Sequence, residues 1–407
     1  MKKYLLIIML FILFGASAQH KITGKVISTD GKKPIASASI FFSNTSKGSI
    51  SNEQGAFEIN NIGDGKYDLV ASCMGYETKV QTVQPSKITE PIIIELKPKV
   101  AELKEVVVGG YVKEGWAQWG QFFLDNFIGQ SSYAQNCTIK NPETIQFRNY
   151  KKQRLLKVFA DETLVIENNS LGYIIRYSLE LFQYDFKTGI LLYQGYPLFE
   201  KMETKRERKQ ERWDEKRSKV YYGSQLHFMR SLFRNKVAEQ GFEIRKLVKE
   251  PNLEKQRIKA LYATSIIRKT AGNIVTIERP SYFKDSAAYY ENILSQPDEK
   301  EIVFPGLLIS DSIAYAVNPT TVGLDFTDYL RITYTRIKED DDYLLQRHIN
   351  RQAMTPVSLL KLINNQPIQI FADGLYYESL DLLNSGYWAW SEKMATMLPY
   401  DYWPAKK

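Results

Sequence analysis

The first hundred residues alternate between apolar and polar side chains in short runs. Between Lys21 and Leu96, apolar residues recur at every second position, as in the series Ala36, Ala38, Ile40 and Phe42. Turn-forming residues such as Asp30-Gly31 interrupt these runs. A period of two predicts strands with one buried face, and frequent turns are typical of a small antiparallel β-sandwich.

The glycines and aromatic residues of this segment follow a recognisable order. They read Gly24-x-Val26, Asp30-Gly31, Pro34-Ile35-x-x-Ala38-x-Ile40, Gly55-x-Phe57-x-Ile59, Gly65-x-Tyr67-x-Leu69 and Gly75-Tyr76. This order resembles the carboxypeptidase-regulatory-like domain. The resemblance implies a transthyretin-like, seven-strand sandwich over residues 19–97, of the kind found at the N-terminus of TonB-dependent outer-membrane receptors. It implies an envelope protein, and it does not imply peptidase activity, since that domain carries no catalytic residues.

Residues 1–18 have the pattern of a secretory signal peptide. Lys2 and Lys3 precede a short apolar run, and Ala16-Ser17-Ala18 supplies small residues for cleavage after Ala18. The run is about half as long as the roughly 20 residues that cross a bilayer. We therefore expect export without a transmembrane helix, and location in the periplasm or peripherally at the outer membrane of a Gram-negative envelope. No cysteine follows the cleavage site, so a lipid anchor is not expected.

A charged segment at residues 98–114 predicts a linker. It is similar to the segment that joins the same module to the plug of TonB-dependent receptors. Roughly 290 residues follow, too few for a plug and a 22-stranded barrel whose strands each need about 9–11 residues. Residues 115–407 are therefore expected to form a different domain of unknown function. The fold class is a multidomain chain with an all-β sandwich and a larger α+β domain.

Helical periodicity appears in three places after the linker. Apolar residues at positions 116, 119, 122, 123, 127 and 128 predict a helix with one apolar face, ended by Gly129. This face is expected to pack in the core of the new domain, with a surface-docking or lipid-facing helix as the alternative. The charge-rich residues 201–219 predict a solvated helix, with a partner-binding arm as the alternative. Ser224 is placed to cap a third helix, expected over residues 225–240 and closed by Gly241.

Strand patterns fill much of the remaining chain. Between Glu143 and Met202 the apolar phase shifts near residues 179–182, as a β-bulge causes, and Lys187-Thr188-Gly189 predicts a hairpin turn. Further strands are expected at residues 273–278, 301–309, 329–337 and 356–372, which predicts an antiparallel sheet. The acidic residues 339–342 are expected to form a solvated turn, since they lack the glycine and ligand spacing of a calcium loop.

The cysteine content and the net charge narrow the possible functions only slightly. Cys73 and Cys137 are the two cysteines, and an oxidising compartment would allow either a disulfide or two free thiols. The formal net charge is +8, which favours anionic surfaces weakly or reflects a solvated surface. Export argues against a nucleic-acid partner.

Candidate catalytic residues are scarce. His20, His227 and His348 are the three histidines, and the common metal, nucleotide and hydrolase motifs are absent. Ser224 and His227 have the spacing of a nucleophile and base, but both have ordinary structural roles as a cap and a helix residue. We expect no catalytic, cofactor-binding or metal-binding residues. A pair of carboxylates distant in sequence remains open, because glycosidases use such pairs.

Aromatic residues are concentrated near the C-terminus. They are Tyr376, Tyr377, Tyr387, Trp388, Trp390, Tyr400, Tyr402 and Trp403. Such side chains can stack on sugar rings, or they can pack in a core with their polar tips exposed. The segments Tyr222-Gly223-Ser224-x-x-His227-Phe228 and Leu398-Pro399-Tyr400-x-Tyr402 are also similar to an uncharacterised family of exported proteins with the same N-terminal module, which implies architecture alone.

The sequence therefore favours a non-catalytic, exported protein of the cell envelope. Its β-sandwich would act as an interaction module, and its α+β domain would bind an envelope protein partner or a glycan through the C-terminal aromatic residues. A role accessory to outer-membrane nutrient or glycan uptake fits this reading. Two alternatives stay open: an envelope hydrolase with a carboxylate-based site, and a small outer-membrane β-barrel.

Overall fold

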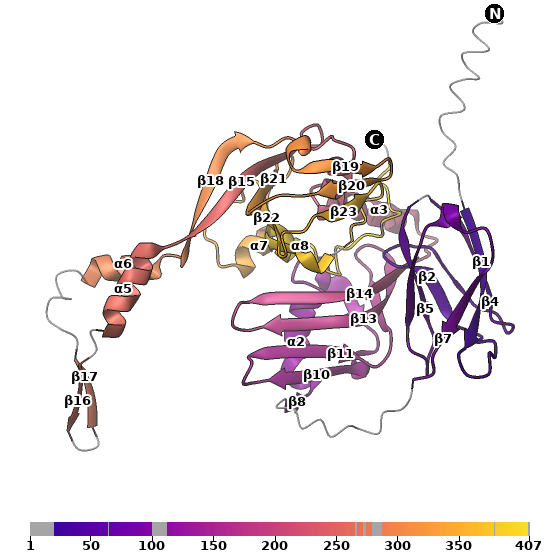
Figure 1. Ribbon diagram of the computed structural model, residues 1–407, viewed down its shortest axis with the longest axis horizontal. Helices are drawn as coiled ribbons and strands as arrows, with labels where there is room; N and C mark the ends of the chain where they lie inside the picture. Colours follow the sequence, from indigo (N-terminus) through magenta and orange to yellow (C-terminus); the bar gives the residue numbers. More distant parts are fainter. Residues whose placement is uncertain are drawn as a thin grey trace, which may run out of the picture.

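The computed structural model describes residues 20–63, 65–99, 112–264, 267–271, 274–278, 287–377 and 379–405. The expected signal peptide, residues 1–18, and most of the expected linker lie outside this range. The described chain forms a β-sandwich, a two-part body and a projecting arm (Figure 1). An all-β sandwich followed by a larger α+β region with antiparallel sheets confirms the predicted fold class. No helix in the described ranges is long and apolar enough to cross a membrane.

The N-terminal sandwich has two sheets, ordered β4-β1-β7 and β3-β2-β5-β6. Its strands are β1 (His20–Ser28), β2 (Ser39–Phe42), β3 (Gly48–Ile50), β4 (Ala56–Ile62), β5 (Tyr67–Ser72), β6 (Lys79–Val83) and β7 (Ile92–Leu96). Buried residues alternate with exposed ones along β1, as a period of two requires. Ile40, Phe57 and Leu69 are among the side chains that fill the core between the sheets.

The lower part of the body is a seven-stranded antiparallel sheet, ordered β8-β10-β11-β13-β12-β9, with β14 paired to β13. The strands are β8 (Val112–Glu114), β9 (Cys137–Ile139), β10 (Ile145–Tyr150), β11 (Leu155–Ala160), β12 (Leu164–Asn168), β13 (Tyr173–Asp185) and β14 (Ile190–Lys201). Helix α2 (Trp116–Phe127) packs on the sheet through the buried Phe123 and Phe127. The predicted helix, its end at Gly129 (φ +107°) and the bulge in β13 are confirmed.

The upper part of the body contains a five-stranded sheet, β18-β15-β21-β22-β24, and a three-stranded sheet, β19-β20-β23. The strands are β15 (Phe242–Pro251), β18 (Glu299–Leu307), β19 (Ala314–Asn318), β20 (Thr321–Leu324), β21 (Tyr329–Tyr334), β22 (Val357–Leu362), β23 (Ile368–Phe371) and β24 (Leu382–Gly386). Helix α4 (Gln225–Phe233) joins their common core through Phe228, Met229 and Leu232. The other helices of the body are α3 (Glu207–Tyr221), α7 (Asp341–Gln346) and α8 (Tyr387–Ser391).

An arm is inserted between the paired strands β15 and β18. It consists of α5 (Leu253–Thr264), the hairpin β16 (Ile267–Ala271) and β17 (Ile274–Glu278), and α6 (Ala287–Ser295). It projects away from the body at the end of the long β15–β18 ribbon (Figure 1). Lys255 and Lys259 both contact the Asp298 carboxylate, at 2.9 and 2.8 Å, and tie α5 to the end of the ribbon. Short 3-10 helices complete the description: η2 (Pro85–Lys87), η3 (Ala134–Asn136), η4 (Pro142–Thr144), η6 (Ser310–Ser312) and η7 (Ser379–Asp381).

Three expectations differ from the structure for local reasons. The helix expected over 225–240 ends at Phe233, because Asn235 adopts a left-handed conformation (φ +53°) that is typical of a residue just after a helix. The acidic turn expected at 339–342 begins helix α7, since the Asp340 side chain accepts from the Asp342 N–H. Val112–Glu114, assigned to the linker from sequence, pairs as β8 with β10.

The sandwich docks on the body through the turn between β2 and β3. The Asn44 N–H donates to the Pro197 carbonyl at 2.8 Å, and the Tyr400 N–H donates to the Asn44 carbonyl at 2.7 Å. The Ser46 N–H donates to one Asp401 carboxylate oxygen at 2.9 Å, and its hydroxyl donates to the other at 2.5 Å. The turn therefore lies between strand β14 and the C-terminal segment, so the sandwich is in contact with two distant parts of the chain.

Candidate functional site

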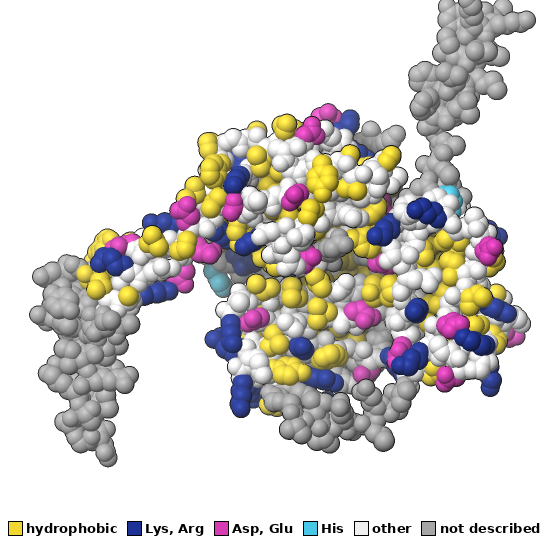
Figure 2. Space-filling view, in the orientation of Figure 1, with side chains coloured by type: hydrophobic (Ala, Val, Ile, Leu, Met, Phe, Trp, Pro, Cys, Tyr) yellow, Lys and Arg dark blue, Asp and Glu magenta, His cyan; other side chains and the backbone are white. Residues whose placement is uncertain are grey.

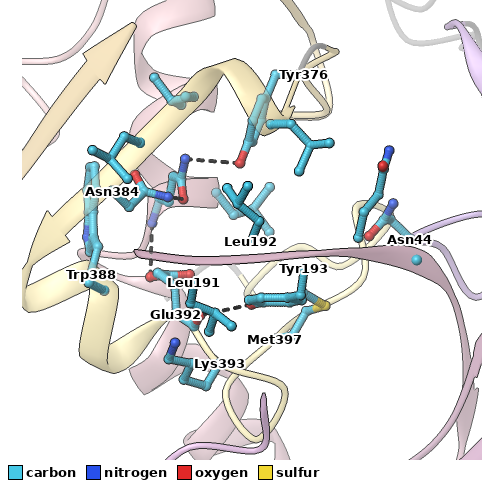
Figure 3. Close-up of a pocket in the computed structure, with 18 of the residues that line it drawn as sticks. Asn44, Leu191, Leu192, Tyr193, Tyr376, Asn384, Trp388, Glu392, Lys393 and Met397 are labelled. Atoms are coloured by element: carbon cyan, nitrogen blue, oxygen red, sulfur yellow. Dashed lines mark hydrogen bonds between the residues drawn. The ribbon is translucent and has the colours of Figure 1, made fainter. Parts of the chain in front are cut away.

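A cavity of about 1090 Å³ lies where the sandwich, the lower sheet and the upper part of the body meet. Strand β14 contributes residues 190–197, and strand β24 and helix α8 contribute the facing wall. The sandwich contributes Ser43, Asn44 and Asp68. Figure 3 shows Trp388 and Glu392 toward one end of the cavity and Asn44 at the other. A volume of this size is at the upper end of ligand-binding cavities in proteins.

Side-chain amides organise one wall of the cavity. Gln225, the first residue of α4, donates from Nε2 to the Tyr376 hydroxyl at 3.1 Å. Its Oε1 accepts from Asn384 Nδ2 at 3.0 Å. Ser224 is the N-cap of α4, because its hydroxyl accepts a hydrogen bond from the His227 N–H. The cap fixes Gln225 as the first residue of the helix. The array places amide and phenol groups, which both donate and accept, side by side.

Asn384 has an unused acceptor in this array. Its Oδ1 is buried and makes no hydrogen bond to the described residues. Buried amide oxygens in proteins are almost always hydrogen-bonded, so this unpaired acceptor within the wall is an exception.

Glu392 is the ionisable group at the centre of this wall. Its Oε1 accepts from the Gln225 N–H at 3.1 Å, at the N-terminus of α4. Burial raises the pKa of the Glu392 carboxyl to about 7. The neighbouring Lys393 also lines the cavity, and burial lowers the pKa of its ammonium group to about 8. Both side chains therefore pay a desolvation cost when charged.

Aromatic and apolar side chains also line the cavity. Tyr193 of β14 lines the cavity, and its hydroxyl donates to the Glu392 carbonyl at 3.5 Å. Trp388 Nε1 donates to the Gly223 carbonyl at 2.8 Å, which fixes the plane of the indole. Leu191 and Met397 add apolar surface beside these rings (Figure 3). Apolar ring faces thus lie next to hydrogen-bonding groups.

The eight aromatic residues singled out from the sequence fall into three places. Tyr376, Tyr377, Trp388 and Tyr400 line the large cavity. Tyr402 and Trp403 line a second cavity of about 920 Å³. Tyr387 and Trp390 instead pack against Tyr343 of α7, with ring centres 5.1 and 5.4 Å from it. The structure brings four of the eight together.

The second cavity lies between α3, the C-terminal segment and the sandwich. Tyr173 is fully buried at its floor, and its hydroxyl has no partner among the described residues. Arg217 stacks over the Tyr173 ring at 4.3 Å and donates to the Leu171 and Gly172 carbonyls. The Arg217 guanidinium is therefore already hydrogen-bonded within the protein. The Tyr173 hydroxyl is the group at the floor of this cavity that has no partner among the described residues.

Ser224 and His227 do not form a nucleophile and base. The Ser224 hydroxyl donates to the Tyr221 carbonyl at 2.7 Å. The His227 Nδ1 accepts from the Gly223 N–H at 3.2 Å, and its Nε2 lies 3.1 Å from Gln240 Oε1. Burial lowers the pKa of the imidazole to about 4. The pair has structural roles at the start of α4.

Metal and thiol chemistry find little support in the described residues. No group of three or more histidine, cysteine, aspartate or glutamate side chains there is arranged to hold a metal ion. Cys73 and Cys137 are both free thiols, which answers the question of pairing that the sequence left open. Burial raises the pKa of the Cys137 thiol to about 12, so it is unreactive at neutral pH.

The amide and carboxyl side chains that organise the large cavity were not identified from the sequence. Gln225 and Asn384 are 159 positions apart, and Gln225 and Glu392 are 167 apart. Their convergence depends on how β24 and α8 pack on α4. The Ser224 cap was the one feature of the sequence that marked any of these residues. It predicts where α4 begins, and so it places Gln225 but neither Asn384 nor Glu392.

Comparison with known proteins supports the N-terminal assignment. Residues 22–108 match the family model of the CarboxypepD_reg-like domain, which confirms the resemblance drawn from the glycine and aromatic pattern. No curated protein matches the chain.

Similarities to solved structures are weak. A mutant type II cohesin–X-dockerin complex from Acetivibrio cellulolyticus is 20% identical over 19% of this chain, with a TM-score of 0.15. The chain spans about half, 51%, of that protein. A DUF3823 family protein from Bacteroides ovatus is 9% identical, covering 87% of this chain and 100% of its own, with a TM-score of 0.16. A protein of unknown function from Bacteroides fragilis is 9% identical, covering 91% and 96%, with a TM-score of 0.17. Scores this low establish no shared fold.

Proposed function

We propose that this chain, whose residues 22–108 match the CarboxypepD_reg-like domain, is a non-catalytic exported protein of the cell envelope that binds a ligand in the large cavity. The signal-peptide pattern of residues 1–18 supports export. The use of the same module in outer-membrane receptors supports a place in the periplasm or peripherally at the outer membrane. There the protein would be accessory to the uptake of nutrients or glycans.

A glycan is the ligand class that the cavity fits best. Sugars present apolar C–H faces and many hydroxyl groups. The single observation that carries the proposal is the array of Gln225, Tyr376 and Asn384 beside the indole of Trp388. The indole and phenol rings offer faces for C–H groups, and the amides can donate to and accept from hydroxyls.

The test is direct binding. The purified protein would be screened on an array of soluble polysaccharide fragments, and each fragment that binds would be titrated by calorimetry. Truncation of Tyr376 to Ala is expected to weaken binding at least about ten-fold, since a hydrogen-bonding ring is lost from the wall. Tyr315→Ala is the matched control, because Tyr315 is 50% exposed on β19 and does not line the cavity. Equal affinities of the two variants, or no binding of any fragment, would contradict the proposal.

One observation favours a hydrolase as the second candidate. Glu392 lines the cavity, and burial raises the pKa of its carboxyl to about 7, a value that suits a general acid. Fragments that bind would be incubated with the protein and assayed for new reducing ends. Glycan cleavage that Glu392→Gln abolishes, with binding retained, would establish the hydrolase. Binding without cleavage would support the non-catalytic assignment.

A further inference from the structure

Three basic residues lie side by side across the outer face of the lower sheet, and we call them the basic row. Lys113 of β8 is directly opposite Arg148 of β10, and Arg148 is directly opposite Lys157 of β11. Their side chains lie on the face away from the core, because the alternate residues Phe147 and Val158 are buried on the other face. Lys113 is exposed, and Arg148 and Lys157 are partly exposed.

Two of these cations lie over aromatic rings of the neighbouring strand. The guanidinium carbon of Arg148 is 4.4 Å from the centre of the Phe159 ring, and Lys157 Nζ is 5.7 Å from the centre of the Tyr150 ring. Each ring attracts the cation above it and holds it near the surface of the sheet. In Figure 1 helix α2 lies behind β10 and β11, and Figure 2 shows basic and hydrophobic side chains next to one another on the face that these strands turn to the viewer.

The basic row opposes the stability of the sheet. Directly opposed side chains of like charge destabilise a strand pair, whereas opposite charges stabilise it. Other charged residues in and beside this sheet have opposite-charge contacts, since Arg176 contacts Glu200 at 2.8 Å and Lys140 contacts Glu167 at 3.4 Å. In the basic row, like charges are opposed on three neighbouring strands. A local cost in stability is typical of a place on the surface that serves binding.

The spacing of the basic row suits a linear polyanion. Neighbouring strands lie about 4.8 Å apart, so the row presents positive charges at regular intervals along a line across the strands. A polymer with an acid group on each repeating unit complements such a line. The signal-peptide pattern of residues 1–18 argues against a nucleic acid. A lipid surface fits less well, because Tyr150 and Phe159 are partly buried beside their cations, whereas membrane-surface elements insert exposed apolar side chains.

We propose that the basic row binds an acidic polysaccharide. Its carboxylate or sulfate groups lie along Lys113, Arg148 and Lys157, and its sugar rings lie beside Phe159 and Tyr150. These five residues line neither of the two cavities described above, so this site is separate from the proposed glycan cavity and does not depend on it. The acid groups of the polymer offset the repulsion between the opposed cations.

Polysaccharides of different charge test the proposal with the purified protein. Calorimetry would measure the binding of polygalacturonate, which carries carboxylates, of dextran sulfate, and of neutral dextran. The acidic polymers are expected to bind, and neutral dextran is expected not to bind. Binding should be lost at about 1 M salt, where charges are screened beyond about 3 Å. Binding of one acidic polymer alone would support the proposal and identify the acid group that the row recognises.

Charge reversal in the basic row tests its location. Lys157→Glu places a carboxylate opposite Arg148 and is expected to raise the Kd for an acidic polymer at least about ten-fold. Lys157→Gln, which only removes the charge, should give an intermediate Kd. Lys25→Glu is the matched control, because Lys25 is exposed on β1 of the sandwich and the change in net charge is the same. It should leave the Kd within about two-fold, since distant exposed charges are screened.

Thermal unfolding separates a loss of binding from a loss of folding. Lys157→Glu replaces a like-charge pair with an opposite-charge pair. The variant is therefore expected to melt at the same temperature as the natural protein or higher, although it binds the polymer more weakly. A lower melting temperature for both Lys157→Glu and Lys157→Gln would show that this lysine stabilises the sheet, and it would overturn the proposal.

Three further results would also overturn it. Neither acidic polymer could bind, and binding of phosphatidylglycerol vesicles in that case would assign the row to a lipid surface. Neutral dextran could bind as tightly as dextran sulfate, which would leave the charges without a role. Lys157→Glu and Lys25→Glu could raise the Kd equally, which would mean that binding follows net charge and not the basic row.

Discussion

The guanidinium carbon of Arg230 lies 3.6 Å from the centre of the Trp403 ring. The same guanidinium donates to the carbonyl oxygens of Tyr400 and Tyr402, at 2.9 Å each, and to that of Asp373 at 2.7 Å. Arg230 is 1% exposed. One buried side chain on α4 thus fixes the C-terminal segment, which in turn contacts the sandwich through Asp401.

Arg230→Lys is expected to destabilise the protein by about 3 kcal/mol or more. A lysine ammonium cannot reproduce the planar fork that reaches three carbonyls and stacks on an indole. It would also leave a buried charge poorly paired. Urea unfolding gives the free-energy difference. Arg234→Lys is the matched control, since Arg234 also lies over Trp403, at 4.5 Å, but is exposed. Equal effects of the two substitutions would show that the buried hydrogen bonds contribute little.

Elements with local signals were predictable from the sequence. The apolar face of α2, the bulge in β13 and the glycine pattern of the sandwich each depend on residues near one another in the chain. Periodicity and turn chemistry determine such elements before the rest of the chain packs. The short helix α7 was missed because an acidic cluster reads as a solvated turn, although Asp340 also has the identity of a helix cap.

The candidate site could not be predicted from the sequence and became visible only in the structure. Gln225, Asn384 and Glu392 belong to three elements, and only the packing of β24 and α8 on α4 brings them together. The aromatic pattern near the C-terminus named candidate binding residues, and four of the eight line the cavity. It did not show that Tyr387 and Trp390 turn toward Tyr343 while Tyr376 and Trp388 face the cavity. Composition indicates what kinds of contacts a segment can make, and tertiary packing decides which ones form.

Leu69→Ala is expected to cost about 2–5 kcal/mol in the unfolding of the sandwich. Leu69 lies in β5 and is fully buried in the core between the two sheets. Ile93→Ala on β7, where the side chain is 64% exposed, should change stability by less than about 0.5 kcal/mol. Thermal and urea unfolding of the two variants measure the difference. A small effect of Leu69→Ala would mean that the sandwich core relaxes around the missing side chain.

Ser224→Ala and His227→Ala are expected to destabilise the protein to different extents. Loss of the Ser224 cap should cost about 1 kcal/mol. His227 is 2% exposed and its ring lies 5.0 Å from the rings of both Tyr221 and Phe242, so His227→Ala leaves a hole and should cost about 3 kcal/mol. Urea unfolding measures both. A larger loss from Ser224→Ala would assign that hydroxyl a role beyond capping.

Glu392 and Lys393 are expected to change the stability of the protein in two separate pH ranges. Burial raises the Glu392 pKa from 4.5 to about 7, so the folded state holds more protons than the unfolded state between these values. Stability is therefore lost as pH rises through that window. Burial lowers the Lys393 pKa from 10.5 to about 8, so the folded state holds fewer protons between pH 8 and 10.5. Stability from this group is gained as pH rises there.

Glu392→Gln is expected to remove the acidic part of this profile, because glutamine stays neutral at every pH. Relative to the variant, the natural protein should lose roughly 2 kcal/mol between about pH 4.5 and 7, a value reduced for the partial exposure of the carboxyl to the cavity. Lys393→Gln should leave that loss in place and remove the gain above pH 8. Urea unfolding at a series of pH values measures both differences. Parallel curves for the natural protein and Glu392→Gln would mean that the cavity hydrates the carboxylate well enough to keep it charged, and the wall would then present an anion to a ligand at neutral pH.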